Sequence, residues 1–366
     1  MCKEFIKIRE FLVRDDFDGF TADDLFIKKF IKQGWGQDIA TLSNMAEGLR
    51  NIALTEPESK HEMAELIDQV IQRAVHRSVN PWKKSIDKVT EFGHFGYYLE
   101  HLNIILGCYQ LVGDDRHLDL NTRVTLHLRD ASLMQENAHA RLLPHVKMRW
   151  SADQAAIIYS IWLYDTNNGT TYADEPLQRW LAYMHENATH PETGLFITEV
   201  MGMKKYSEQP RGCSAAYMIY YMSYFAPEIA QSQWALFKGH MGVSMLGLRG
   251  FREYLPEFDG EWTPDSGPVI AGVGVAATGL SLKTAAALGD QRMFDAILCL
   301  AAMGTTMLGT AEMIPKIGNF AKIGTDLLAS SIILAAKTQC GFSLRYRTQA
   351  RDIGSSLRTH DIHRTS

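Results

Sequence analysis

Acidic and imidazole side chains stand at the starts of apolar segments in this 366-residue chain, where they could do chemistry. Asp153 follows Trp150 and precedes a very apolar run, so loss of solvent would raise the pKa of its carboxyl group, as a general acid requires. His101 stands inside another apolar stretch, one helical turn after Tyr97. Such residues predict acid–base chemistry, although Asp153 is also placed to act as a helix cap and His101 as a hydrogen-bonded core residue.

Further candidates occupy similar positions. Cys213 opens an apolar segment, and a helix start lowers the pKa of a thiol, although a free cysteine is commonly a small core residue. Asp265 precedes the apolar segment Pro268–Leu282 and, with Asp153, would supply the two carboxylates that glycosidases use. The remaining substrate-binding candidates at these starts are His94, Tyr97, Trp150 and Tyr217.

Four turn signals recur at nearly constant spacing and predict how these residues are positioned. Each closes an apolar stretch of helical length, and the gaps between Gly113, Asn168, Pro227 and Gly289 are 55, 59 and 62 residues. Such a period fits one antiparallel helix pair with its loops, and six pairs would fill the chain. We therefore expect an all-α (α/α)6 barrel, a toroid of helix hairpins.

Helical periodicity supports this architecture. Apolar residues recur at i, i+3, i+4 and i+7, whereas alternating β-branched runs are nearly absent. The strongest helices are predicted at 94–112, 155–164, 215–224, 270–288 and 325–337. Helices that end at equivalent turns run in the same direction around a ring, so their N-terminal ends should meet at one rim. The candidate residues lie at those ends, and a pocket is expected there.

Composition limits the partners and cofactors. We expect one domain over residues 1–344 and a polar, aperiodic tail over 345–366. A net charge of −5 without a basic stripe argues against nucleic-acid binding. An N-terminus without an apolar signal region, and the lack of a long uncharged apolar span, predict a cytoplasmic protein without stable membrane insertion. Scattered cysteines and the absence of nucleotide or zinc motifs predict no cofactor and no metal.

Five segments together match one known family, and WLYDTNNGT and ALGDQRMFD within them fall in its order and spacing. They are AEGLRNIAL at Ala46–Leu54, EHLNIILGCYQLVGDDR at Glu100–Arg116, WSADQAAIIYSIWLYDTNNGTTY at Trp150–Tyr172, HPETGLF at His190–Phe196 and VGVAATGLSLKTAAALGDQRMFDAIL at Val273–Leu298. Together they resemble the linalool dehydratase/isomerase family, an (α/α)6-barrel group that acts on terpene alcohols. The resemblance covers roughly residues 46–342, mainly in segments that build the scaffold.

The resemblance implies an active site made of a histidine, two cysteines, an aspartate and tyrosines, with acid–base chemistry and no metal. The family histidine falls on His101, and the methionine one turn before it is Tyr97 here. One family cysteine aligns with Asp153, the other falls near His145, and a site tyrosine falls near Cys213. Because both cysteines are replaced and the family's N-terminal aspartate–tyrosine pair has no secure match, the resemblance implies the fold together with a changed acid–base set and substrate.

These observations lead to one leading hypothesis and two alternatives. The leading hypothesis is a metal-independent lyase, isomerase or cyclase acting on a small hydrophobic isoprenoid alkene or alcohol. Asp153 would protonate the substrate, His101 would accept a proton or hold an oxygen, and aromatic rings would line the pocket. The alternatives are a carbohydrate-processing barrel that uses Asp153 with Asp265, and a non-catalytic binding scaffold.

The N-terminal region raises the question of assembly. Residues 1–35 are amphipathic, with Phe5, Ile8, Phe11 and Leu12 along one stripe. In the resembled family, barrels form cyclic oligomers in which this region completes a neighbour's pocket. The resemblance therefore implies a homo-oligomer, whereas the alternative is that the segment packs on its own barrel as part of the first helix pair.

Overall fold

The computed structural model describes residues 2–25, 28, 36–201, 208–245, 248–258, 260, 263, 265–270, 272–310 and 326–339. This part of the chain contains twelve α-helices and six short strands. The helices are α1 (Lys3–Leu12), α2 (Gln37–Thr55), α3 (Lys60–Val75), α4 (Gly96–Val112), α5 (Leu118–Leu133), α6 (Ser151–Asn168), α7 (Asp174–Asn187), α9 (Gly212–Phe225), α10 (Pro227–Met241), α11 (Val275–Leu288), α12 (Gln291–Thr310) and α14 (Leu327–Lys337).

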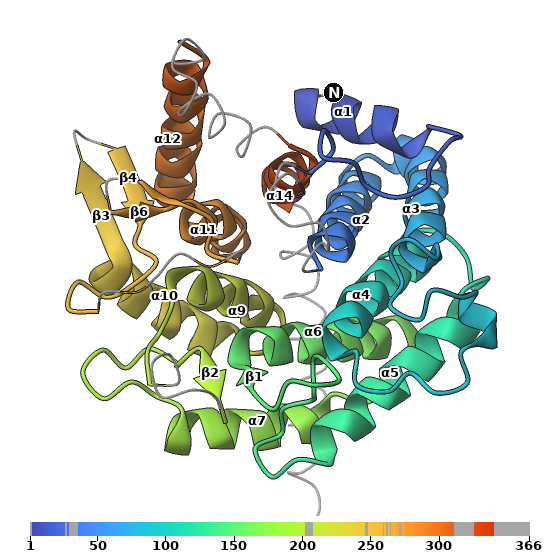
Figure 1. The fold of residues 1–366 in the computed structure, drawn as a ribbon, viewed down its shortest axis with the longest axis horizontal. Coiled ribbons are helices and arrows are strands. Elements are labelled where there is room, and N and C mark those ends of the chain that lie inside the picture. The colour runs from blue at the N-terminus through green and yellow to red at the C-terminus, as the bar shows by residue number, and fades with distance from the viewer. Residues whose placement is uncertain are drawn as a thin grey trace, which may run out of the picture.

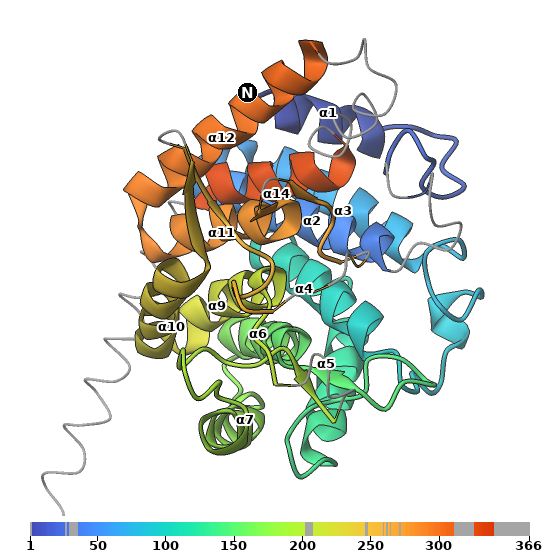
Figure 2. The same ribbon diagram turned by 60° about the vertical axis from the view of Figure 1, so that its left-hand side comes forward.

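Six of these helices form a closed inner ring. In order around the ring, each packs against the next: α2, α4, α6, α9, α11 and α14, and α14 packs against α2 again (Figure 1). The other six helices, α1, α3, α5, α7, α10 and α12, lie outside this ring, and the turned view in Figure 2 shows α7, α10 and α12 on its periphery. The arrangement confirms the predicted all-α (α/α)6 barrel.

The two layers explain the sequence patterns. Inner helices touch neighbours on all sides, so α4, α6 and α9 bury most of their residues and show little amphipathic character. Outer helices bury one stripe only. In α3, for example, the buried apolar residues are Met63, Leu66, Ile67, Val70, Ile71 and Ala74.

The predicted turns end the inner helices as expected. Gly169 follows α6 with φ +67°, and Gly289 follows α11 with φ +72°, a left-handed conformation that glycine adopts without steric cost. Pro227 stands in the first turn of α10, where its missing N–H leaves no hydrogen bond unmade. The sequence period therefore marks the inner-to-outer connections correctly.

The short strands were not expected. They form three antiparallel pairs: β1 (Arg149–Trp150) with β2 (Glu199–Val200), β3 (Gly242–Met245) with β4 (Leu248–Phe251), and β5 (Val269–Ile270) with β6 (Val273–Gly274). Strands of two to four residues are too short to give an alternating pattern. The predicted helix at 270–288 accordingly begins later, at Val275, because Ile270 lies in β5.

Helix α1 packs on its own barrel, against α3 and α14. Phe5, Ile8, Phe11 and Leu12 are each 2% exposed or less, so this chain alone covers the apolar stripe that the sequence shows.

Two parts of the sequence predictions cannot be compared with the structure. Residues 26, 27 and 29–35 of the N-terminal region, and the predicted tail at 345–366, lie outside the described residues. Homo-oligomerisation stays a prediction. Among the described helices, none has the length and apolarity needed to cross a membrane.

Candidate active site

The N-terminal parts of neighbouring inner helices bring several candidate residues together at one rim. Asp153 lies in the first turn of α6 and Glu100 in the second turn of α4, the helix beside it in the ring. Tyr217 lies in the second turn of α9, which packs on the other side of α6. The predicted meeting of helix ends therefore places acidic and aromatic side chains within reach of one another.

Glu100 and Asp153 form a hydrogen-bonded carboxyl pair. Two carboxylates cannot hydrogen-bond without a proton, so one of them must be protonated. Burial, followed by the charge of Asp153, raises the pKa of Glu100 well above its usual range. Burial, followed by the charge of Asp265, raises the pKa of Asp153 to about 7. At neutral pH, Glu100 therefore keeps its proton and donates to Asp153, which is itself poised to gain or lose one.

His101 lies beside this pair as a neutral imidazole. Its Nε2 atom is 3.8 Å from Glu100 Oε1 and 3.5 Å from the Tyr217 hydroxyl, and the ring of Tyr97 packs against it with centroids 4.9 Å apart. Burial lowers the pKa of His101 to about 3. A group with so little affinity for a proton is better suited to hold a substrate oxygen than to act as a base near neutral pH.

Cys213 belongs to a second polar group at the start of α9. Its Sγ lies 2.9 Å from Glu253 Oε1, and its backbone N–H donates to Glu253 Oε2 at 3.1 Å. Arg211 Nε donates to the same carboxylate at 3.0 Å. Burial and the charge of Glu253 raise the pKa of the Cys213 thiol well above its usual range. The lowered thiol pKa expected at a helix start is therefore wrong here, and Cys213 is a protonated donor to Glu253.

Two more carboxylates extend the group. Glu199 stands opposite Trp150 in the β1–β2 pair, its side chain bonds to Trp150, and burial raises its pKa. Asp265 lies in an exposed turn, yet the protein atoms around its carboxyl group displace enough water to raise its pKa, an effect that Arg211 partly offsets. Asp265 interacts electrostatically with both Asp153 and Glu199. We call the following five residues the carboxylate cluster: Glu100, Asp153, Glu199, Glu253 and Asp265.

Two predicted site residues lie elsewhere. His94 is exposed in the loop before α4, and the charged groups that act on it are those of Arg141, His127 and Arg149. His145 is exposed in the loop before β1, and no described contact joins it to the cluster. Both loops carry these histidines to the surface. The predicted residues that the structure does bring to the rim are Tyr97, His101, Trp150, Asp153, Cys213, Tyr217 and Asp265.

Three members of the cluster were missed by sequence reasoning. The sequence does offer a reason to select Glu100, because a glutamate inside an apolar helical segment, directly before His101, is unusual. Glu199 lies in a two-residue strand and Glu253 follows β4, so neither belongs to a periodic pattern. Their proximity depends on tertiary pairing that one sequence does not reveal.

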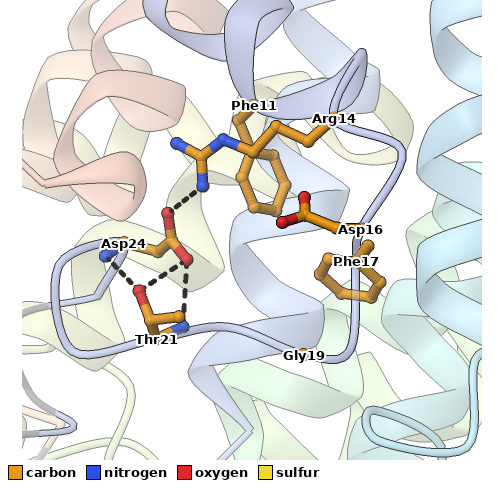
Figure 3. Close-up of a pocket in the computed structure, with 7 residues that line it drawn as sticks. All are labelled: Phe11, Arg14, Asp16, Phe17, Gly19, Thr21 and Asp24. Atoms are coloured by element: carbon orange, nitrogen blue, oxygen red, sulfur yellow. Dashed lines mark hydrogen bonds and ion pairs between the residues drawn. The ribbon is translucent and has the colours of Figure 1, made fainter.

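The N-terminal loop encloses a separate hollow of about 280 Å³, lined by Phe11, Arg14, Asp16, Phe17, Gly19, Thr21 and Asp24 (Figure 3). Arg14 Nη1 donates to Asp24 at 2.9 Å, and the backbone N–H and hydroxyl of Thr21 donate to it at 2.9 and 2.8 Å. Both oxygens of Asp24 are thus used in closing the loop, so we assign no chemistry to this hollow. Within the described ranges, no group of three histidine, cysteine or acidic residues could hold a metal ion.

Comparison with known proteins supports the fold. No protein-family model and no curated protein matches the chain. A solved structure of a family 76 glycoside hydrolase from a bovine Bacteroides thetaiotaomicron strain is similar to it, with a TM-score of 0.51. The match has 10% sequence identity and covers 84% of this chain and 70% of that chain. At this identity the likeness shows a shared (α/α)6 barrel and nothing finer.

Proposed function

We propose that this protein is an acid–base enzyme that breaks a carbon–oxygen bond in its substrate. The observation that carries the proposal is the pair of Glu100 and Asp153, in which the pKa of Asp153 is raised to about 7. A carboxyl group with a pKa near neutrality can give a proton to a leaving oxygen and take it back afterwards. In this proposal Asp153 is the general acid, and Glu100 fixes its orientation and its affinity for the proton.

The first substrate class that we propose is a glycoside. Glycosidases pair a protonated acid with a second carboxylate, and Asp265 acts electrostatically on Asp153 from the rim. Asp265 would activate water or attack the sugar carbon, while His101 would hold a hydroxyl group. The barrel shared with a glycoside hydrolase supports this choice over the isoprenoid substrate that the sequence led us to expect.

An isoprenoid alcohol is the second candidate, because aromatic rings lie next to Glu100 and His101. Tyr97 packs against His101, and Tyr217 donates to Glu100 at 3.4 Å. The π-faces of such rings stabilise positive charge that develops when protonated oxygen leaves carbon. The same Asp153 would then catalyse dehydration, isomerisation or cyclisation, as the resemblance to the linalool dehydratase/isomerase family implies.

One assay separates these candidates. The purified protein is incubated with a panel of neutral oligosaccharides and aryl glycosides, and with a panel of terpenoid alcohols, polyenes and terpenoid-decorated aromatics, and mass spectrometry follows the products. We expect turnover in one panel, with loss of the product when Asp153 is replaced by Asn. A folded protein that transforms no member of either panel would overturn the proposal and favour a binding scaffold.

A further inference from the structure

The carboxylate cluster carries an excess of negative charge. Within the described residues, Arg211 is the one cation that acts on these five carboxyl groups. It already forms an ion pair with Glu253. Lys283 acts on His101 from deeper in the ring, but it is bound to Glu47 at 2.6 Å. Within the described ranges, and with one proton held by Glu100, four acidic groups remain at this rim against one cation.

The cluster also contains a buried acceptor atom without a donor. Within the described part of the chain, Oε2 of Glu199 has no hydrogen-bond partner, and this residue is 4% exposed. A buried acceptor that loses water without gaining a donor is costly. A ligand that fits this rim therefore brings N–H or O–H donors, and one that also brings positive charge offsets the repulsion among the carboxylates.

We propose that the carboxylate cluster recognises a protonated amine on its ligand and rejects carboxylate and phosphate groups. This inference rests on the proposed function, because it concerns the same site, and it names the kind of substrate or inhibitor that the site takes. The ammonium group lies beside Glu199, which stands opposite Trp150 just before the start of α6, and one of its N–H bonds reaches the unpartnered Oε2. The rings of Tyr97 and Tyr217, which lie beside Glu100 and His101, add a cation–π contribution.

Two matched series of ligands test the proposal without depending on turnover. One series is glucosamine, glucose and glucuronate, and the other is geranylamine, geraniol and geranic acid. Calorimetric titration of the wild-type protein, at a pH below the pKa of each amine, gives the affinities. In whichever series binds to the protein, we expect the amine to bind at least about tenfold more tightly than the neutral alcohol or sugar. The carboxylate should bind more weakly than either. Added salt should reduce the amine preference.

Two glutamate-to-glutamine variants test whether Glu199 causes the preference for the amine. Glu199→Gln should reduce the ratio of amine to alcohol affinity several-fold, whereas Glu62→Gln, at an exposed pair with Arg9, should leave the ratio unchanged. Equal affinities within a series, a preference for the carboxylate, or no binding of either amine would overturn the proposal. A charge preference without turnover of any substrate would refute the proposed function alone. Turnover without a charge preference would refute this inference alone.

Discussion

Asp153 owes its properties to its neighbours. Its place in the first turn of α6 would normally favour an ionised carboxylate, since a helix N-terminus attracts negative charge. Burial and the charge of Asp265 outweigh that effect and raise its pKa to about 7. The sequence predicted this residue because an aspartate preceded a very apolar helix. It could not predict Glu100 as its partner, since nothing in a helical pattern shows which polar residue meets the neighbouring helix.

The charge of Asp265 should be measurable at Asp153. The Asp153 carboxyl should titrate near pH 7 in the wild-type protein, and at lower pH in Asp265→Asn, because removal of a nearby negative charge makes ionisation easier. Carbon-13 NMR of the aspartate carboxyls measures this directly, with Asp114→Asn, an exposed site paired with Arg116, as the control. An Asp153 titration that is the same in Asp265→Asn and in the wild type would remove Asp265 from the site.

Enzymatic activity should follow the same ionisation. A general acid acts in its protonated form, so the rate should fall as pH rises through about 7, the pKa of Asp153. The pH dependence of kcat/KM, which reports ionisations of the free enzyme, checks this expectation. Activity that rises steadily through this range would indicate that Asp153 acts as a base or not at all.

At the scale of elements, close approaches hold the rim in place. The backbone N–H of Gly212 donates to Glu253 O at 2.8 Å, and a Cβ on Gly212 would lie 2.0 Å from the carbonyl oxygen of Arg252. Only glycine allows the start of α9 to lie this close to the segment after β4. That contact brings Arg211 and Cys213 to Glu253, a pairing that helical periodicity does not predict.

A matched pair of glycine substitutions tests this account. Gly212→Ala should reduce the free energy of unfolding by about 1–3 kcal/mol through overpacking, and should reduce activity by shifting Glu253. Gly239→Ala, in α10 with open space around the new methyl group, should be neutral or raise it by up to about 1 kcal/mol. Denaturant unfolding of both variants measures the difference. Equal effects of the two substitutions would show that the close approach is unimportant.

At the scale of the whole molecule, the inner helices close a ring, and buried polar contacts link helices across its interior. The spacing of turns predicted six helix pairs, because each pair repeats the same local chemistry. It did not predict the network inside the ring, where Lys283 of α11 bonds to Glu47 and Asn44 of α2 at 2.6 and 2.7 Å. Its Nζ also lies 4.1 Å from the ring centroid of Tyr220. Such partners come from distant segments, so a single sequence contains no local signal for them.

Removal of one partner of the buried Lys283–Glu47 ion pair should strongly reduce the stability of the protein. Lys283→Met removes the cation that is hydrogen-bonded to the buried Glu47 side chain, which should cost about 3–5 kcal/mol of unfolding free energy. Lys238→Met breaks a partly exposed pair with Asp290 and should cost no more than about 1 kcal/mol. Chemical denaturation compares the two variants. A smaller loss in Lys283→Met than in Lys238→Met would contradict the account of the barrel interior.

The N-terminal helix provides a test at the same scale. Because α1 covers α3 and α14 of its own chain, deletion of Met1–Gly19 should expose apolar surface, lower the thermal stability and promote aggregation. Light scattering and thermal melts would show this, and sedimentation of the intact chain would establish its oligomeric state. A shortened chain that remained soluble, with unchanged stability and turnover, would show that the helix has no structural or shared catalytic role.

Replacement of Asp153 by Asn is the most direct measurement of the central claim. Asn keeps the shape of the side chain and can still accept the hydrogen bond from protonated Glu100, so the fold should lose less than about 1 kcal/mol of stability. The rate on the substrate identified in the panels should fall by about 10²–10⁴-fold, the usual contribution of a positioned acid. Retention of wild-type turnover by a folded Asp153→Asn protein would contradict the assignment of Asp153 as the general acid.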